Sequence, residues 1–575
     1  MMKVYLLVFL LAVPLARAEG PYPVDPASQP HEGVPKGTVT KHHFEASKLY
    51  PGTSRDYWVY TPAQYDAAKP ACLMVFQDGG GYAGKVPVVF DNLIQSGEMP
   101  VTIGVFIDPG VVAAPDDKAQ PRFNRSYEYD GFTADYAKFL NDELLPEVAK
   151  DRNISTDPDH RGIAGASSGG IAAFNVAWQR PDQFRRVYSM VGTFVGLRGG
   201  EEFSTLVRKT EPKPLRIFLQ DGSNDNNIYC GDWWMANQMM ERSLQFSGYE
   251  VGHEWGEGPH SGQHGSAIMP TAMRFLWKDF PKPVAVNYEA CRSKAKEMLI
   301  PGKDWEKVGA GYGHAAGLTA APDGTVFFTD TGKNRVICQV GADGKVSPFL
   351  ENPKAIGALA FGPDGRLYGC RGSEIVSWDL ATKQEKIHAT GLNADALTIG
   401  HNGTIYAADP EKHAVWIIRP GQEKALGSDA FRGVSGISLT PDQTRLDVAD
   451  PGGRYVWSAT LAGDGSVANV QPYHQIHLPP ADADPTSHAA GLQATRDGWL
   501  LVASVMGVQI CDQPGRVNLI LPPPTGATPP TGVCLGGKDH KTLYITCGSK
   551  VFRRETQMAG ACAADAPVKP PMPHL

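Results

Sequence analysis

Hydrophobic and polar residues follow two different patterns in the two halves of the chain. In the first half, short apolar runs alternate with stretches of helical spacing. The expected strands are 57–60, 72–77, 103–107, 161–164 and 215–219, and the expected helices are 136–145, 170–178 and 235–246. Strands that alternate with helices are typical of a mostly parallel sheet with helices on both faces. The first half therefore predicts an α/β domain.

The second half carries a repeat of a tight turn, a strand and a small polar residue. The turn residues are Asp323, Asp364, Asn402, Asp442, Asp497 and Asp539, and the gaps between them are 41, 38, 40, 55 and 42 residues. A period of about 40 residues with tight turns between strands indicates propeller blades. The sequence predicts a six-bladed β-propeller over residues 306–557, a linker over 281–305, and a Pro/Ala-rich, disordered tail over 558–575.

Composition supports two domains and excludes some partners. A chain of 575 residues is too long for one core. Hydrophobic residues make up 42% and charged residues 20%, as in ordinary globular proteins. The net charge of −7 gives no reason to expect nucleic acid or an anionic membrane surface as a partner.

The N-terminus has the features of an export signal. Lys3 precedes an apolar run over 4–15, and Ala16-Arg17-Ala18 supplies the small residues of a cleavage site. We expect a signal peptide over 1–18 and a periplasmic or extracellular protein. The run is too short to cross a membrane, and no later segment reaches about 18 apolar residues, so no membrane span is expected.

The nine cysteines show no zinc-site spacing. Export permits disulfides, but the odd number leaves at least one cysteine without an internal partner.

The segment Gly165-Ala166-Ser167-Ser168-Gly169 matches G-x-S-x-G between an expected strand and an expected helix. In α/β-hydrolases this turn exposes a nucleophilic serine beside a helix N-terminus. We therefore predict Ser167 as the nucleophile. The alternative is a glycine-rich turn whose serines only cap the helix.

A serine nucleophile needs a base, an acid and an oxyanion hole. The loop over 256–265 offers His260 and His264 as the base, and the end of the 215–219 strand is followed by Asp221, Asp225 and, further on, Asp232 as the acid. The order serine, acid, histidine is that of α/β-hydrolases. Gly79 and Gly80, after the 72–77 strand, are expected to donate backbone N–H groups to an oxyanion together with Ser168.

These residues carry a resemblance to the esterase D and enterochelin esterase-like hydrolases, relatives of feruloyl and acetyl-xylan esterases. It covers about 36–280 and rests on 76–79, 124–129, 144–148, the 165–169 turn and 258–260. The family's G-x-H turn favours His260 over His264. Its Gly-Thr-x-Asp turn favours Asp225, with Ser223 in place of threonine. Arg125 and Glu128 are open to two interpretations, a structural ion pair or a border of the substrate cleft.

Residues 306–557 resemble gluconolactonase and regucalcin propellers, which hold a divalent cation on the axis through Glu, Asn and Asp side chains. Those positions fall on Ala316, Ser435, Ala490 and the pair Ala394-Asp395. Because alanine cannot coordinate a hard cation, we expect neither a metal nor another cofactor.

The combined expectation is an exported serine carboxylic-ester hydrolase in which an α/β-hydrolase domain precedes an accessory propeller. The substrate is expected to be a small-molecule or polysaccharide-linked ester. Two rival hypotheses are a metal-dependent lactonase acting through the propeller and a non-catalytic glycan- or partner-binding protein. The sequence does not indicate an oligomeric state.

Overall fold

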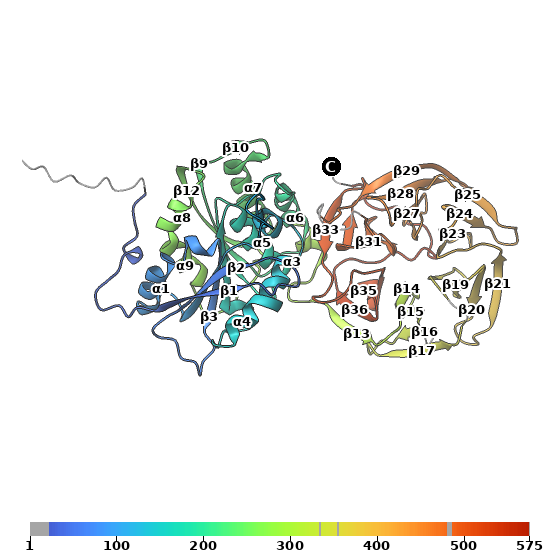
Figure 1. The fold of residues 1–575 in the computed structure, drawn as a ribbon. Coiled ribbons are helices and arrows are strands. Elements are labelled where there is room, and N and C mark those ends of the chain that lie inside the picture. The colour runs from blue at the N-terminus through green and yellow to red at the C-terminus, as the bar shows by residue number, and fades with distance from the viewer. Residues whose placement is uncertain (1–21, 333–334, 354–355, 480–485, 574–575) are drawn as a thin grey trace, which may run out of the picture.

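The computed structural model describes residues 22–332, 335–353, 356–479 and 486–573. Two lobes lie side by side, an N-terminal α/β domain and a C-terminal ring of sheets (Figure 1). The predicted signal peptide lies outside the described residues. No helix in the described ranges is long and apolar enough to cross a membrane.

The first domain is built on one eight-stranded mixed sheet. Its order is β1 (Thr38–Phe44), β2 (Arg55–Thr61), β4 (Thr102–Ile107), β3 (Cys72–Gln77), β7 (Arg161–Ala166), β8 (Arg186–Met190), β9 (Arg216–Asn224) and β12 (Glu250–Pro259). β1 and β2 pair antiparallel, and the strands from β4 to β12 run parallel. The parallel strands therefore end at one edge, where an α/β domain places its site.

Alternation along the central strands divides the core between the two faces of the sheet. Leu73 and Val75 pack on one face, and Met74 and Phe76 pack on the other. The first face carries α3 (Asp135–Lys138), α5 (Ser168–Gln179) and α7 (Trp233–Phe246); the second carries α1 (Val86–Gln95) and α9 (Met269–Trp277). Shorter helices are α2 (Arg125–Tyr129), α4 (Leu145–Ala149), α6 (Phe203–Lys209), α8 (Gly262–Ala267) and α10 (Ala295–Met298). The predicted 136–145 helix is divided by a π-helical turn over Phe139–Leu144.

The second domain consists of six four-stranded antiparallel sheets. The first three are β14–β17 (Ala315–Ala320, Val326–Asp330, Val336–Val340, Val346–Glu351), β18–β21 (Leu359–Phe361, Leu367–Arg371, Glu374–Trp378, Glu385–Thr390) and β22–β25 (Ala396–Ile399, Ile405–Asp409, Ala414–Ile418, Ala425–Ser428). The next two are β26–β29 (Gly436–Leu439, Arg445–Ala449, Tyr455–Leu461, Val467–Gln475) and β30–β33 (Leu492–Ala494, Leu500–Ser504, Gly507–Cys511, Val517–Leu521). The last joins β34–β36 (Gly532–Gly536, Thr542–Cys547, Lys550–Glu555) to β13 (Glu306–Ala310). Both ends of the domain thus share one blade, which closes the ring.

The predicted six-bladed propeller is confirmed, and the sequence repeat has a simple structural meaning. Each of the six turns joins the first strand of a blade to the second; the Asp323 turn, for example, joins β14 to β15. Because each blade has one such turn, the six turns in the sequence correspond to six blades.

The expectation of a disordered tail was wrong for its described part, 558–573. Val568 N donates to Pro441 O at 2.8 Å, and Gln513 Nε2 donates to Pro571 O at 2.7 Å. The tail therefore crosses the blades and is held by hydrogen bonds that its composition does not reveal.

The lobes are joined through the segment after α6. Thr210 forms a parallel β-bridge with Ile520 of β33. Both carboxylate oxygens of Glu211 accept hydrogen bonds from the Arg554 guanidinium at 2.6 Å. The Arg554 side chain is 2% exposed. An ion pair buried this deeply is costly to break on one side only, which fixes the contact between the lobes.

All nine cysteines lie in the described residues and are free thiols.

Candidate functional site: a serine, histidine and aspartate at the ends of parallel strands

Ser167 occupies a strained turn between β7 and α5. Its φ of 58° and ψ of −123° lie in a region that side chains rarely adopt, at a cost of about 1–3 kcal/mol. The flanking glycines make the turn possible, because a Cβ on Gly165 would lie 2.3 Å from Gly169 O. Ser167 N donates to Met190 O at 2.9 Å, which fixes the turn to the neighbouring strand.

A chain of hydrogen bonds joins three of the predicted residues. Ser167 Oγ lies 2.9 Å from His260 Nε2, and His260 Nδ1 lies 2.6 Å from Asp225 Oδ1. His260 is held by the loop after β12 and Asp225 by the turn after β9. The Asp225 side chain is fully buried, whereas that of His260 is 23% exposed. The order serine, imidazole, buried carboxylate has the geometry of a nucleophile, a base and an orienting acid.

Asp225 is held in its ionised form. Burial raises the pKa of this carboxyl group, but the hydrogen bond from His260, the contact with Asp221 and the hydrogen bond from the Asn226 N–H outweigh burial and lower it. An ionised carboxylate next to Nδ1 favours the tautomer that leaves Nε2 free to accept the Ser167 proton.

The alternative residues lie elsewhere. His264 stacks on Tyr22 at 4.2 Å between ring centroids and hydrogen-bonds with Gln220 Nε2 at 3.1 Å. Asp232 caps α7 by accepting the Met235 N–H at 3.0 Å. Asp221 is buried behind Asp225, and its carboxyl group contacts Asp225. Of the two histidines and three aspartates, His260 and Asp225 form the chain to Ser167.

The three expected oxyanion donors differ in availability. No hydrogen bond to a described residue uses the backbone N–H of Gly79 or of Ser168, which stand at the first positions of a 3₁₀ turn and of α5. The Gly80 N–H instead donates to Asp108 Oδ1 at 2.8 Å. Gly79 must be glycine, because a Cβ there would lie 2.2 Å from the backbone of Phe106 and Ile107. Gly79 and Ser168 are therefore the better donor pair.

Arg125 joins the two sides of the site, which sequence reasoning missed. It donates to both carboxylate oxygens of Asp78 at 2.8 Å and to Ala166 O at 3.3 Å. Asp78 has a φ of 56° just before Gly79. Arg125 thus ties the glycine loop to the end of β7. An Arg125–Glu128 pair is not formed, because Glu128 binds Arg55 in the core.

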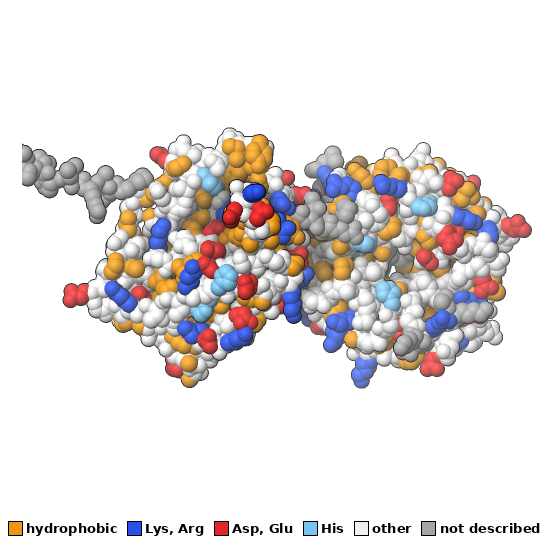
Figure 2. Space-filling model, viewed as in Figure 1, with side chains coloured by type: hydrophobic (Ala, Val, Ile, Leu, Met, Phe, Trp, Pro, Cys, Tyr) orange, Lys and Arg blue, Asp and Glu red, His pale blue; other side chains and the backbone are white. Residues whose placement is uncertain are grey.

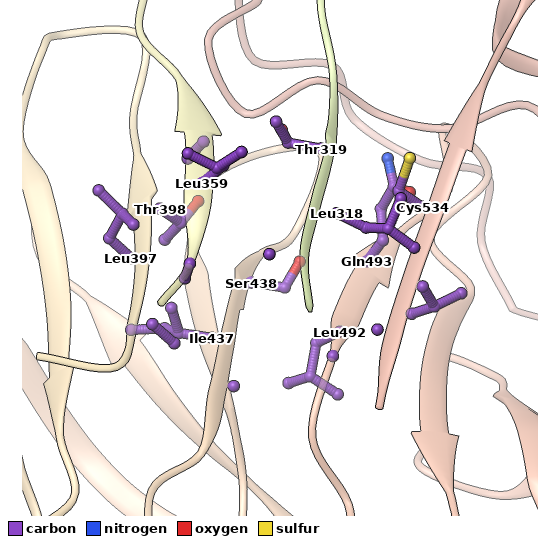
Figure 3. Close-up of a pocket in the computed structure, with 18 of the residues that line it drawn as sticks. Leu318, Thr319, Leu359, Leu397, Thr398, Ile437, Ser438, Leu492, Gln493 and Cys534 are labelled. Carbon is purple, nitrogen blue, oxygen red and sulfur yellow. The ribbon is translucent and has the colours of Figure 1, made fainter. Parts of the chain in front are cut away.

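An axial cavity of about 300 Å³ runs between the propeller blades (Figure 3). Apolar side chains and a few hydroxyl and amide groups line it; Leu318, Thr319, Leu397, Thr398, Ser438 and Gln493 are examples. Ala561, Cys562 and Ala563 of the tail also line this cavity.

Most of the positions where related propellers hold a cation lack a free side-chain oxygen. Ala316 and Ala490 have no side-chain oxygen, and Ser435 Oγ donates to Ala489 O at 2.5 Å. Asp395 keeps a carboxylate and lines the cavity. In the part of the chain that the structure describes, no cluster of three or more His, Cys, Asp or Glu side chains is placed to hold a metal. No chemical step is assigned to a metal at this position.

Comparison with known proteins agrees with this architecture. Residues 50–266 match the family described as "Putative esterase", and residues 314–549 match the SMP-30/Gluconolactonase/LRE-like region. The first domain thus matches an esterase family, and the second domain matches a gluconolactonase-like region. Both predicted resemblances and the predicted fold class are confirmed.

Curated relatives match the esterase-family domain. It is 27% identical over 267 residues to the iron(III) enterobactin esterase of Dickeya dadantii (strain 3937), covering 41% of this chain and 56% of the relative. Identity to the iron(III) enterobactin esterase of Escherichia coli (strain K12) is 26% over 211 residues, covering 35% of this chain and 50% of the relative. The chain spans about half the length of these curated relatives.

The gluconolactonase-like propeller is similar to the gluconolactonase of Xanthomonas campestris, with 19% identity and a TM-score of 0.40 over 45% of this chain and 91% of that structure.

Proposed function

We propose that this protein is an exported serine carboxylic-ester hydrolase whose reaction takes place in the esterase-family domain. The hydrogen-bonded chain Ser167–His260–Asp225 is the observation that carries the proposal. The esterase relatives support the reaction class.

The reaction follows from the positions of these groups. Ser167 Oγ attacks the ester carbonyl carbon while its proton passes to His260 Nε2, and the carbonyl oxygen becomes an anion. The N–H groups of Gly79 and Ser168 stabilise that anion. His260 then gives its proton to the departing alkoxide, which leaves as an alcohol. Water repeats the sequence on the acyl-serine, releasing the carboxylic acid and restoring Ser167.

Exposed apolar residues that follow Asp225 in the chain support a substrate ester that carries an apolar group. Ile228, Tyr229, Met235 and Met239 are 49–89% exposed and follow Asp225 in the chain. In Figure 2, apolar side chains gather over β10 (Asn227–Ile228) and the start of α7. Exposed apolar side chains this close together commonly mark a binding surface. We propose that they receive part of a small-molecule or polysaccharide-linked ester.

We propose that the propeller takes no part in the chemistry and is metal-free. Hydrolysis of a p-nitrophenyl acyl ester by the full chain is then expected to be unchanged in excess EDTA, because no step uses a metal. Steady-state rates before and after chelation measure this. Loss of activity in EDTA, restored by adding a divalent cation, would support the propeller lactonase instead.

Export is proposed from the N-terminal pattern alone. The mature chain is expected to begin near Glu19, which the mass of the protein recovered from the periplasm or medium would show. A chain that keeps residues 1–18 and stays in the cytoplasm would contradict export.

A further inference from the structure

The two carboxylate oxygens of Asp225 have different surroundings. Oδ1 accepts hydrogen bonds from His260 Nδ1 at 2.6 Å and from the Asn226 N–H at 2.5 Å. Oδ2 is buried and receives no hydrogen bond from any amide, hydroxyl or imidazole group of the described residues. A buried carboxylate oxygen without a donor is costly, so a donor for Oδ2 has to be sought among the neighbouring groups.

The carboxyl group of Asp221, within β9, contacts the carboxyl group of Asp225. Asp221 is 0% exposed. Oδ1 accepts the Gly222 N–H at 2.7 Å, and Oδ2 accepts the side-chain amide of Asn237 at 2.8 Å. Asn237 is itself anchored on α7 by the carbonyl oxygens of Gly192 and Trp233, at 2.9 and 3.0 Å. Asp221 is therefore rigidly placed behind Asp225.

Two buried carboxyl groups in contact cannot both be ionised without a large repulsion. The groups around them decide which one keeps the proton. His260 faces Asp225 from the β12 loop, whereas Asp221 faces the neutral amide of Asn237 from α7 and the Gly222 N–H from its own strand. Burial, followed by contact with Asp225, raises the pKa of Asp221 to about 9, and the hydrogen bond from His260 helps to lower the pKa of Asp225. The proton therefore resides on Asp221.

We propose that Asp221, as a neutral carboxylic acid, donates a hydrogen bond to Oδ2 of Asp225 and so holds Oδ1 toward His260. Asp221 is a positioning residue for the reaction and touches no substrate. The inference rests on the proposed function, since it concerns the same serine, histidine and aspartate.

Three variants of the full chain test the proposal. Asp221→Ala removes the donor and is expected to lower kcat for a p-nitrophenyl ester about 10- to 100-fold with KM unchanged, because a misoriented base costs rate rather than binding. Asp221→Asn keeps an N–H donor and is expected to stay within about 3-fold of the parent. The matched control is Asp232→Asn, since Asp232 caps α7 without contacting Asp225 and its variant is expected to keep the parent kcat.

The pH dependence of stability separates a proton held on Asp221 from a packing role. The folded state keeps a proton on Asp221 that the unfolded chain loses above its ordinary pKa of 3.8. The parent therefore loses stability as pH rises from about 4 to about 9, and Asp221→Asn does not pay this cost. The stability of Asp221→Asn relative to the parent is expected to increase steadily across that window.

The proposal is overturned if Asp221→Ala keeps the parent kcat, if Asp221→Asn is as slow as Asp221→Ala, or if the stability difference does not change with pH. If Asp221→Ala fails to fold, the kcat of Asp221→Asn and the pH dependence of its stability still test the proposal. Failure here leaves the proposed function intact as long as Ser167→Ala is inactive.

Discussion

Replacing Ser167 with alanine is expected to reduce kcat for ester hydrolysis by about 10⁴-fold or more. The variant keeps the neighbouring N–H groups but has no oxygen to form the acyl intermediate. Steady-state hydrolysis of a p-nitrophenyl acyl ester by the full chain measures the effect. Ser204→Ala, on α6 away from the chain of hydrogen bonds, is the matched serine control and is expected to keep the parent rate.

The Ser167→Ala fold is expected to be unchanged, because alanine fills the same turn. The strain at Ser167, whose φ is 58°, lies in the backbone, so removing the hydroxyl group does not change it. Far-UV circular dichroism and the unfolding midpoint therefore serve as controls. Substantial activity in a folded Ser167→Ala protein would show that another group is the nucleophile.

Replacing His260 is expected to have an effect of similar size. His260→Ala leaves Ser167 Oγ without the acceptor that lies 2.9 Å away, so the hydroxyl group stays protonated and kcat falls about 10⁴-fold or more. Added imidazole is expected to restore part of the rate by entering the space left behind.

His264→Gln is the matched histidine control for this prediction. His264 hydrogen-bonds with Gln220 and stacks on Tyr22, so its replacement is expected to change stability more than kcat. Equal loss of kcat in the two variants, with both proteins folded, would contradict the assignment of His260 as the base.

Local patterns carried much of the fold prediction. A Cβ on Gly165 would collide with the backbone of Gly169, and a Cβ on Gly169 would crowd the Gln77 and Asp78 side chains, so the spacing of the two glycines encodes the turn directly. The propeller turns recur because every blade needs the same hairpin between its first two strands. Such features depend on neighbours in sequence, and sequence reasoning finds them.

Contacts between distant segments were harder to foresee. Arg125 was open to a pairing with Glu128, three residues away, yet it binds Asp78, 47 residues away. Gly80 was expected to face an oxyanion, and its N–H instead donates to Asp108, which directly follows β4, the strand next to β3. The tail composition suggested disorder, but carbonyl groups of Pro441 and amides of Gln513 and Gln443 fix it on the propeller. In each case the partner is determined by the assembled sheet and not by local propensity.

The interface between the lobes raises the question of what the propeller contributes. The buried Glu211–Arg554 pair and the Thr210–Ile520 bridge attach it to the segment after α6. α6 packs against α7, the helix that carries the exposed Met235 and Met239. The propeller is therefore attached to the first domain beside α6, which packs against α7.

The central claim is that Ser167 is an activated nucleophile, and active-site labelling tests it most directly. The folded full chain is treated with a fluorophosphonate probe, digested, and analysed by mass spectrometry to locate the adduct. We predict one phosphonylated serine, Ser167, with labelling abolished in Ser167→Ala and strongly slowed in His260→Ala. An unlabelled parent protein, or an adduct on another residue that persists in Ser167→Ala, would contradict the account.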